Sequence, residues 1–262
     1  MNTDLKPEKL CLTSSPSVIF AGGLPEPERN AAAISSLPSL AEVLDEIGPL
    51  PKTALFFGQA EDGLPVLLDL TNPRPGPILV AGEAGAGKTR LLRVIAQFIA
   101  AAHRPEEVQY GVVTSRPEEW SDLVDVPHCV GVFPADAVAA AELIHALALW
   151  TRMERSPRQS VVLMIDGLEE FASFTCASEH DMQTVLVDGP ASRIWTVAAW
   201  EPSRGHSAGH WLPHFHTRVF GYTEGSDVFH AEPAADLQTL ARGREFSLRK
   251  NSAEIRFRIP RG

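Results

Sequence analysis

The residues whose types and spacing could most clearly do chemistry lie between positions 82 and 89. This segment reads Gly-Glu-Ala-Gly-Ala-Gly-Lys-Thr and matches the pattern G-x-x-x-x-G-K-[ST] at every fixed position. A helix N-terminus offers unpaired N–H groups and a positive dipole end, and glycines let the backbone wrap around phosphates without side-chain clashes. Lys88 is expected to bridge the β- and γ-phosphates of a nucleotide. The ATP-binding residues predicted here are Gly82, Glu83, Ala84, Gly85, Ala86, Gly87, Lys88 and Thr89.

A metal ligand is expected on each of two separate segments. The Thr89 hydroxyl has the position that ligates Mg²⁺ in this motif. The apolar run Val161–Ile165 ends in Asp166, and a carboxylate at a strand tip beside the loop holds the same ion directly or through water. Asp166 could also cap the helix that follows, which is compatible with the metal role. We therefore predict Mg²⁺ as a cofactor, with Asp166 and Lys88 as catalytic residues.

These residues must be positioned by an alternation of strands and helices. Apolar runs of strand length alternate with helical segments that begin near Lys88, Glu118 and Asp136, with a shorter one after Gly167. Such alternation indicates an α/β fold with a mainly parallel sheet flanked by helices. The predicted strands are Pro77–Ala81, Val108–Thr114, Cys129–Phe133, Val161–Ile165 and Trp195–Ala199.

Two β-hairpins flank this alternating region. ALFFGQ and PVLLDL surround Glu61-Asp62-Gly63, which predicts a hairpin with a tight Asp-Gly turn. Near the end of the chain, REFSLRKNSAEIRFRIP alternates apolar and charged residues around Lys250-Asn251-Ser252. One hairpin is thus expected before the phosphate-binding loop and one at the C-terminus.

Residues 1–50 are expected to form an N-terminal extension, and residues 51–262 the main domain. The extension contains six prolines and little periodicity. Its exception is a short helix over about 39–47, where Ser39 and Glu42 form a capping-box pattern and Gly48 can end the helix. The apolar residues of this helix fall on one face, so it should dock on the main domain.

Several stretches together resemble the FtsK/SpoIIIE/HerA class of RecA-like motor ATPases, including the ATPase modules of EccC-type secretion proteins. FFGQAEDGLPVLLDLTNPRPGPILVAGEAGAGKT is similar to that family's hairpin and Walker A segment, and LPHFHTRVFGYTEGSD and REFSL…FRIP are similar to its later strands. The resemblance runs from about Leu37 to Pro260. It implies a RecA-like P-loop ATPase that couples ATP hydrolysis to translocation of DNA or polypeptide. It also implies a homo-oligomeric ring, such as a hexamer, or an assembly with related ATPases.

The chain departs from the family where the water-activating residue should stand. Family motors usually carry Asp-Glu at the end of the Walker B strand, but here Gly167 follows Asp166, and the next acids are Glu169 and Glu170. The family's next strand usually ends in a Gln-Arg sensor, whereas this chain reads Ala199-Trp200-Glu201-Pro202. Loss of a general base typically costs about 10²–10⁴-fold in rate. Either Glu169 or Glu170 replaces the missing glutamate, or the chain is a nucleotide-gated interaction module with little or no turnover.

Family rings take an arginine from the neighbouring subunit. Arg218, in the HTRVF stretch, and Arg193, before the preceding strand, are the candidates for this role. Each could instead be a surface or structural arginine.

The charge of the chain limits the kinds of partner that it can bind. The formal net charge is -10, from 33 acidic and 23 basic residues, which argues against a nonspecific polyanion binder and makes double-stranded DNA a doubtful partner. The exception is the segment 242–262, which holds seven basic and two acidic residues. It could be a hairpin with a charged outer face or a contact for a polyanion.

The remaining signals are weak. His206, His210, His214 and His216 could bind zinc if they converged, but no cysteine or fixed ligand spacing supports a site. The three cysteines form no disulfide framework, and we expect neither a secretory signal nor a transmembrane segment. These features predict a cytoplasmic protein.

Overall fold

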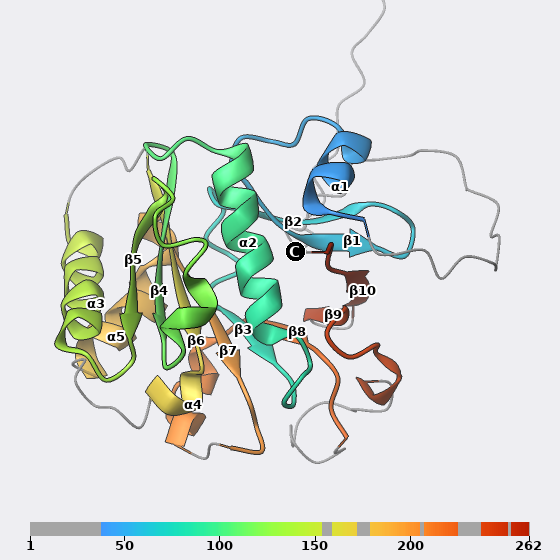
Figure 1. The fold of residues 1–262 in the computed structure, drawn as a ribbon. Helices are drawn as coiled ribbons and strands as arrows, with labels where there is room; N and C mark the ends of the chain where they lie inside the picture. The colour runs from blue at the N-terminus through green and yellow to red at the C-terminus, as the bar shows by residue number, and fades with distance from the viewer. Residues whose placement is uncertain are drawn as a thin grey trace, which may run out of the picture.

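The ten strands found in the described residues belong to one continuous sheet (Figure 1). The computed structural model describes residues 38–153, 159–171, 179–204, 207–224, 237–250 and 253–261. The strand order is β2-β1-β10-β9-β8-β3-β7-β6-β4-β5. The strands from β8 to β5 in this order are parallel, and those from β2 to β9 are antiparallel.

The parallel half of the sheet carries the alternating pattern of the sequence, so the α/β prediction is confirmed. Its strands are nearly all buried on both faces, as expected when helices cover each side. The strands are β3 (Ile78–Ala81), β4 (Val108–Thr114), β5 (Cys129–Pro134), β6 (Ser160–Asp166), β7 (Ile194–Trp200) and β8 (Thr217–Phe220).

The two predicted hairpins form the antiparallel half. They are β1 (Ala54–Ala60) with β2 (Pro65–Asp69), and β9 (Glu245–Lys250) with β10 (Ala253–Arg258). They are not separate appendages, because β1 pairs with β10 and β9 pairs with β8. The C-terminal hairpin therefore joins the N-terminal hairpin to the parallel half.

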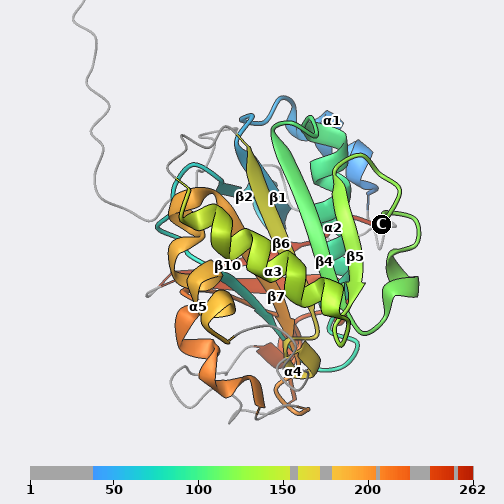
Figure 2. The ribbon, with the colours of Figure 1, turned by 90° about the vertical axis from the view of Figure 1, so that its left-hand side faces the viewer.

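The helices cover the sheet from both sides (Figures 1 and 2). On one face, α1 and α2 pack in one buried apolar cluster, and on the other face α3 and α5 pack in a second. The short α4 begins directly after Gly167. The helices are α1 (Leu40–Ile47), α2 (Lys88–Ala102), α3 (Val138–Thr151), α4 (Leu168–Phe171) and α5 (Glu179–Asp188).

The helix expected from Glu118 is wrong, because the chain there makes only the 3₁₀ turn η1 (Pro117–Trp120). The Trp120 side chain is fully buried and its indole N–H points to Asp166, while Tyr110 donates a hydrogen bond to the Leu123 carbonyl. These contacts draw the segment against the sheet instead of letting it continue as a helix.

The docking helix has the cap that its sequence indicates. The Ser39 hydroxyl accepts a hydrogen bond from the Glu42 amide, and the Glu42 carboxylate accepts one from the Ser39 amide. Val43 is buried in the core beside α2, and the Arg261 amide donates to the Pro38 carbonyl at 2.7 Å. The helix thus packs on the same core as the rest of the described chain.

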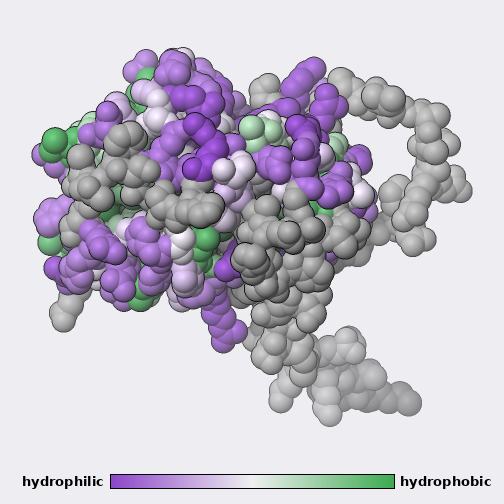
Figure 3. Space-filling view, turned by 90° about the horizontal axis from the view of Figure 1, so that it is seen from below, coloured by the Kyte–Doolittle hydropathy of each residue, from purple (hydrophilic) through white to green (hydrophobic). Residues whose placement is uncertain are grey.

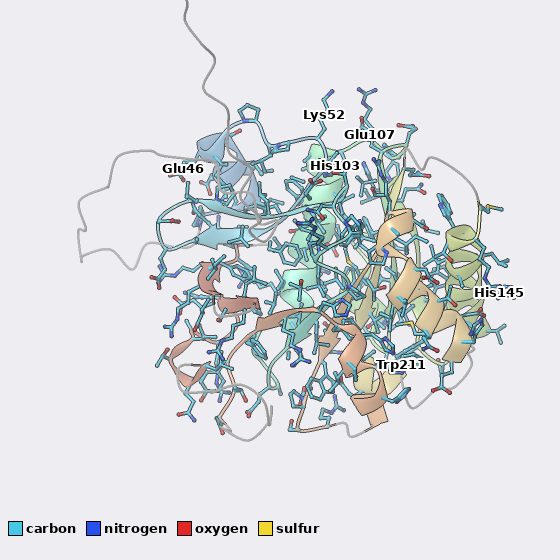
Figure 4. All side chains as sticks on the ribbon, turned by 180° about the vertical axis from the view of Figure 1, so that it is seen from behind. Glu46, Lys52, His103, Glu107, His145 and Trp211 are labelled. Carbon is cyan, nitrogen blue, oxygen red and sulfur yellow. The ribbon has the colours of Figure 1, made fainter. Side chains whose placement is uncertain are left out.

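The two ends of α2 lie at opposite edges of the molecule. The helix begins at Lys88, and the residue after it is His103, whose Nε2 lies 2.9 Å from the Ala54 carbonyl oxygen. Figure 4 shows His103 at this far edge, near Lys52 and Glu107. Among the described helices α2, with 15 residues, is the longest, and none has the length and hydrophobicity needed to span a bilayer.

Candidate nucleotide-binding site

The phosphate-binding loop connects β3 to α2 at the carboxyl edge of the parallel strands. Gly85 and Gly87 have φ values of +75° and +93°, in the region that favours glycine. Within the described part of the chain, the amides of Lys88 and Thr89 have no backbone acceptor. Such free amides at the start of a helix are suited to an anion. The side of the molecule that holds this edge is mainly hydrophilic where described residues are visible (Figure 3).

Three later segments hold the loop in place. The Gly82 amide donates to the Trp200 carbonyl at 3.2 Å, and the Glu83 amide donates to the Tyr222 carbonyl at 3.0 Å. The Gly243 amide donates to the Ala86 carbonyl at 3.2 Å. A Cβ placed on Gly87 would lie 2.7 Å from the Gly243 Cα, so the two backbones touch with no room for a side chain.

The structure brings together the two predicted metal ligands. Thr89 Oγ1 donates a hydrogen bond to Asp166 Oδ1 at 2.8 Å, although the residues are 77 positions apart. Asp166 is buried, and its other oxygen lies 3.3 Å from Trp120 Nε1. The hydroxyl and the carboxylate therefore meet at the start of α2 with fixed orientations.

Lys88 is bound within the loop itself. Its Nζ donates to the carbonyls of Gly82 and Glu83 at 2.8 and 2.9 Å and lies 3.5 Å from Glu201 Oε2. Burial lowers the pKa of the Lys88 ammonium, and the carboxylates of Glu201, Glu169 and Asp166 oppose this effect. Sequence reasoning missed Glu201, whose position directly after a parallel strand beside β3 was the available signal.

The two candidate bases have different surroundings. Glu169 is buried, and its Oε2 accepts a hydrogen bond from the Glu201 amide at 3.1 Å. Burial raises the pKa of Glu169, although its own amide, the Glu201 amide and Lys88 act in the opposite direction. Glu170 instead forms an ion pair with Arg204 at 3.1 Å. Of the two, Glu169 is the one that contacts Glu201 and interacts electrostatically with Lys88.

The arginines are distributed around the sheet. Arg193 lies just before β7, at the edge opposite the phosphate-binding loop, and Arg218 is half-buried within β8. Arg116, which the sequence reasoning did not single out, has Nη2 at 3.5 Å from Thr89 Oγ1 and pairs with Glu119. Its position two residues after β4, at the carboxyl edge, could have marked it.

The basic C-terminal segment is largely paired with acids. Arg242 pairs with Glu224, Arg258 with Glu245, and both Arg249 and Arg256 with Glu254. This arrangement favours the charged outer face of a hairpin over a polyanion contact. Of the four clustered histidines, His206 lies outside the described residues, and the described part holds no group of three potential metal ligands.

The oxygen donors at the site match the chemistry of the expected ion. Mg²⁺ prefers hard oxygen ligands and usually takes only one or two from a protein. Thr89 and Asp166 supply a hydroxyl and a carboxylate oxygen, next to amides that are open to phosphate. The residues present therefore fit Mg²⁺ bound together with a nucleotide.

Comparisons with known proteins agree with this geometry. Residues 49–175 match the FtsK/SpoIIIE family. No curated protein sequence matches the chain. Among solved structures, the cytoplasmic domain of the type VII secretion ATPase EccC of Thermomonospora curvata superposes with a TM-score of 0.65 at 16% identity over 86% of this chain and 32% of that one.

Two further structures are similar to the same extent. EssC (ATPases 2 and 3) from Geobacillus thermodenitrificans has a TM-score of 0.58 at 14% identity over 86% of this chain and 47% of that one. The pCW3 conjugation coupling protein TcpA, solved with ATPγS, has a TM-score of 0.60 at 17% identity, with 86% and 70% covered. The chain spans less than half of the EccC and EssC structures. Residues 49–175 thus match the FtsK/SpoIIIE family, the fold is the RecA-like fold of these ATPases, and the resemblance predicted from the motifs is confirmed.

Proposed function

We propose that this chain binds ATP with Mg²⁺ at the loop Gly82–Thr89 and hydrolyses it. The observation that carries the proposal is the 2.8 Å contact between Thr89 and Asp166 at the N-terminus of α2. Glycine at positions 85 and 87, with positive φ, allows the loop to close around phosphates, and the open amides of Lys88 and Thr89 provide donors. The eight residues Gly82–Thr89 form the proposed ATP site.

Thr89 and Asp166 would hold Mg²⁺. When bound, the ion neutralises charge on the phosphate oxygens and orients them. Trp120 keeps the Asp166 carboxylate aimed at Thr89 through its indole N–H. Lys88 would leave its two carbonyl partners to contact the phosphates, since an ammonium gains more from phosphate charge than from neutral carbonyls.

We further propose that hydrolysis drives the movement of a polymer, DNA or polypeptide, in a ring of several copies or related ATPases. The support is the FtsK/SpoIIIE-type sequence and the likeness in fold to a secretion ATPase and a conjugation coupling protein. Arg193 fits a role between subunits, because at the edge opposite its own P-loop it could reach only a nucleotide bound to another copy. Arg218 fits less well, because it is half-buried within the sheet.

DNA is the less supported of the two polymers. The net charge is -10, and the arginines that would have to contact phosphates on the C-terminal hairpin already pair with Glu245 and Glu254. A polypeptide cargo needs no such basic surface.

A second function is an ATP-binding interaction module whose nucleotide state gates a partner interface. Gly167 favours it, because this residue occupies the position of the usual water-activating glutamate. The ion pair between Lys88 and Glu201 also favours it, since ATP binding would break that contact and thereby change the site.

The test is ATP affinity and steady-state turnover of the purified protein, with and without duplex DNA, beside Lys88→Ala. We expect Lys88→Ala to abolish ATP binding. Wild-type turnover near 1–10 s⁻¹, about the median for enzymes, would support a motor, and stimulation by DNA would identify the polymer. ATP binding with turnover at the level of Lys88→Ala would favour the interaction module, and unchanged binding by Lys88→Ala would refute the site.

A further inference from the structure

The position that normally supplies the water-activating glutamate cannot do so here. Gly167, directly after Asp166, has a φ of +111°, a conformation that side-chain-bearing residues rarely adopt. A Cβ added at this position would also lie 3.2 Å from Glu170 Oε2. The backbone is therefore shaped for glycine, and a carboxylate that serves the site must come from another element.

Glu201 comes from the strand that lies between the two halves of the nucleotide site. β7 pairs in parallel with β3 on one side and with β6 on the other. At the end of β7, Trp200 is in register with Ala81, and Ala199 is in register with Asp166. Glu201 follows immediately, so it enters the site between the phosphate-binding loop and the metal-ligand carboxylate.

The Glu201 side chain is enclosed and held on several sides. Its Oε2 lies 3.5 Å from Lys88 Nζ, and each of the two side chains is only 12% exposed. Ser203 Oγ lies 3.3 Å from Oε1, and the Glu201 amide donates to the buried Glu169 carboxylate at 3.1 Å. Glu170, by contrast, forms an ion pair with Arg204 at 3.1 Å.

We infer that Glu201 is the carboxylate that activates the attacking water, and that Glu169 positions it by binding its backbone amide. This inference rests on the proposed ATP hydrolysis. The water oxygen forms a bond to the γ-phosphorus while the bond from that phosphorus to the β–γ bridging oxygen breaks. One water proton passes to the Glu201 carboxylate and from there to solvent, and ADP and phosphate are released.

The ion pair with Lys88 fits this role. A lysine that contacts the γ-phosphate and a carboxylate that serves the attacking water must stand near each other, because both act on the same phosphoryl group. When Lys88 moves to phosphate, Glu201 loses its ion-pair partner and becomes free to accept a proton. The competing interpretation is that Glu201 only holds Lys88 in the absence of nucleotide.

Glu201→Gln in the full chain separates the two interpretations. Loss of a general base should lower kcat by about 10²–10⁴-fold, with the Kd for ATPγS unchanged or tighter. Glu201→Asp, which keeps the carboxylate, should recover part of the rate. The matched control is Glu118→Gln, an exposed acid on η1, which should leave kcat within about two-fold of wild type.

Other outcomes would overturn the inference. Glu201→Gln with wild-type or faster turnover would reduce Glu201 to a partner of Lys88, and loss of turnover in Glu170→Gln but not in Glu201→Gln would move the base to Glu170. If wild type binds ATP but turns over no faster than Lys88→Ala, no base exists, and the proposed hydrolysis fails with the inference while ATP binding stands. If wild type does not bind ATP, the proposed site itself is wrong.

Discussion

The two halves of the sheet differ in where they keep their charges. In the parallel half, Lys88, Asp166 and Glu169 are buried or nearly so and converge at the carboxyl ends of the strands. In the antiparallel half, charged residues such as Arg258 and Glu245 lie across neighbouring strands and pair near the surface. Ligands of open α/β sheets bind at the carboxyl ends of parallel strands, so the buried charges of the parallel half lie where a ligand would bind.

The antiparallel half contacts the phosphate-binding loop directly through the backbone. Gly243, at the start of the C-terminal hairpin, lies against Gly87 of the phosphate-binding loop and donates to the Ala86 carbonyl. Arg90, on the first turn of α2, reaches the Pro260 carbonyl at 3.0 Å. The antiparallel half therefore shapes the phosphate-binding loop through contacts made by backbone atoms.

The largest expected effect comes from breaking this contact. Gly87→Ala would place a Cβ 2.7 Å from the Gly243 Cα and force alanine into φ +93°, whereas Gly85→Ala meets nothing within 4 Å and has only the conformational penalty at φ +75°. That penalty is about 1–2 kcal/mol. Gly87→Ala should lose clearly more free energy of unfolding than Gly85→Ala, together with most ATP affinity, as measured by urea denaturation and nucleotide titration. Equal losses in the two variants would show that the antiparallel half does not brace the loop.

A smaller effect tests the buried charge of the parallel half. Because burial raises the pKa of Glu169 above its ordinary value of 4.5, its favourable contribution to folding is complete below about pH 4.5 and is lost as the pH rises through the native pKa. Glutamine cannot ionise and can still accept the Glu201 amide. The free energy of unfolding of Glu169→Gln, relative to wild type, should therefore increase from pH 4 to pH 7. A difference that stays constant over this range would contradict a raised pKa.

The smallest effect tests the exposed charges of the antiparallel half. Arg258 Nε lies 2.7 Å from Glu245 Oε1, but the Arg258 side chain is 61% exposed. Such pairs contribute about 0.2–1 kcal/mol and are screened by salt. Arg258→Gln should lower the free energy of unfolding by about 0.5 kcal/mol at low salt and by less in 1 M NaCl. A loss of several kcal/mol, independent of salt, would place this hairpin among the buried-charge regions instead.

Much of the fold follows from local sequence patterns. The strand Val108–Thr114 has the predicted bounds, and the other predicted parallel strands differ by one or two residues at their ends. The capping box at Ser39 and the Asp-Gly hairpin also follow from local residue types. The turn at Glu118 could not be predicted in this way. It depends on the burial of Trp120 against Asp166, a long-range contact, whereas the neighbouring acidic residues favour a helix.

The candidate site was likewise predictable only in part. The motif and the strand ending in Asp166 predicted that Thr89 and Asp166 lie at one site, and the structure places the two residues in contact. Sequence spacing could not tell Glu169 from Glu170, because neighbours on one helical turn differ only in the direction they face. It also could not show that Glu201, 113 positions after Lys88, would reach the lysine, since strand order decides this.

The order in which the chain is made has a consequence for this loop. The phosphate-binding segment is complete once Thr89 is synthesised, but its backbone partners at Trp200, Tyr222 and Gly243 come much later. A nascent chain therefore contains the ATP motif long before the backbone contacts that fix the conformation of the motif can form. Since a ligand stabilises only the state that binds it, nucleotide can stabilise the fold only after Gly243 has emerged from the ribosome. It therefore stabilises chains that include Gly243 and not chains truncated before it.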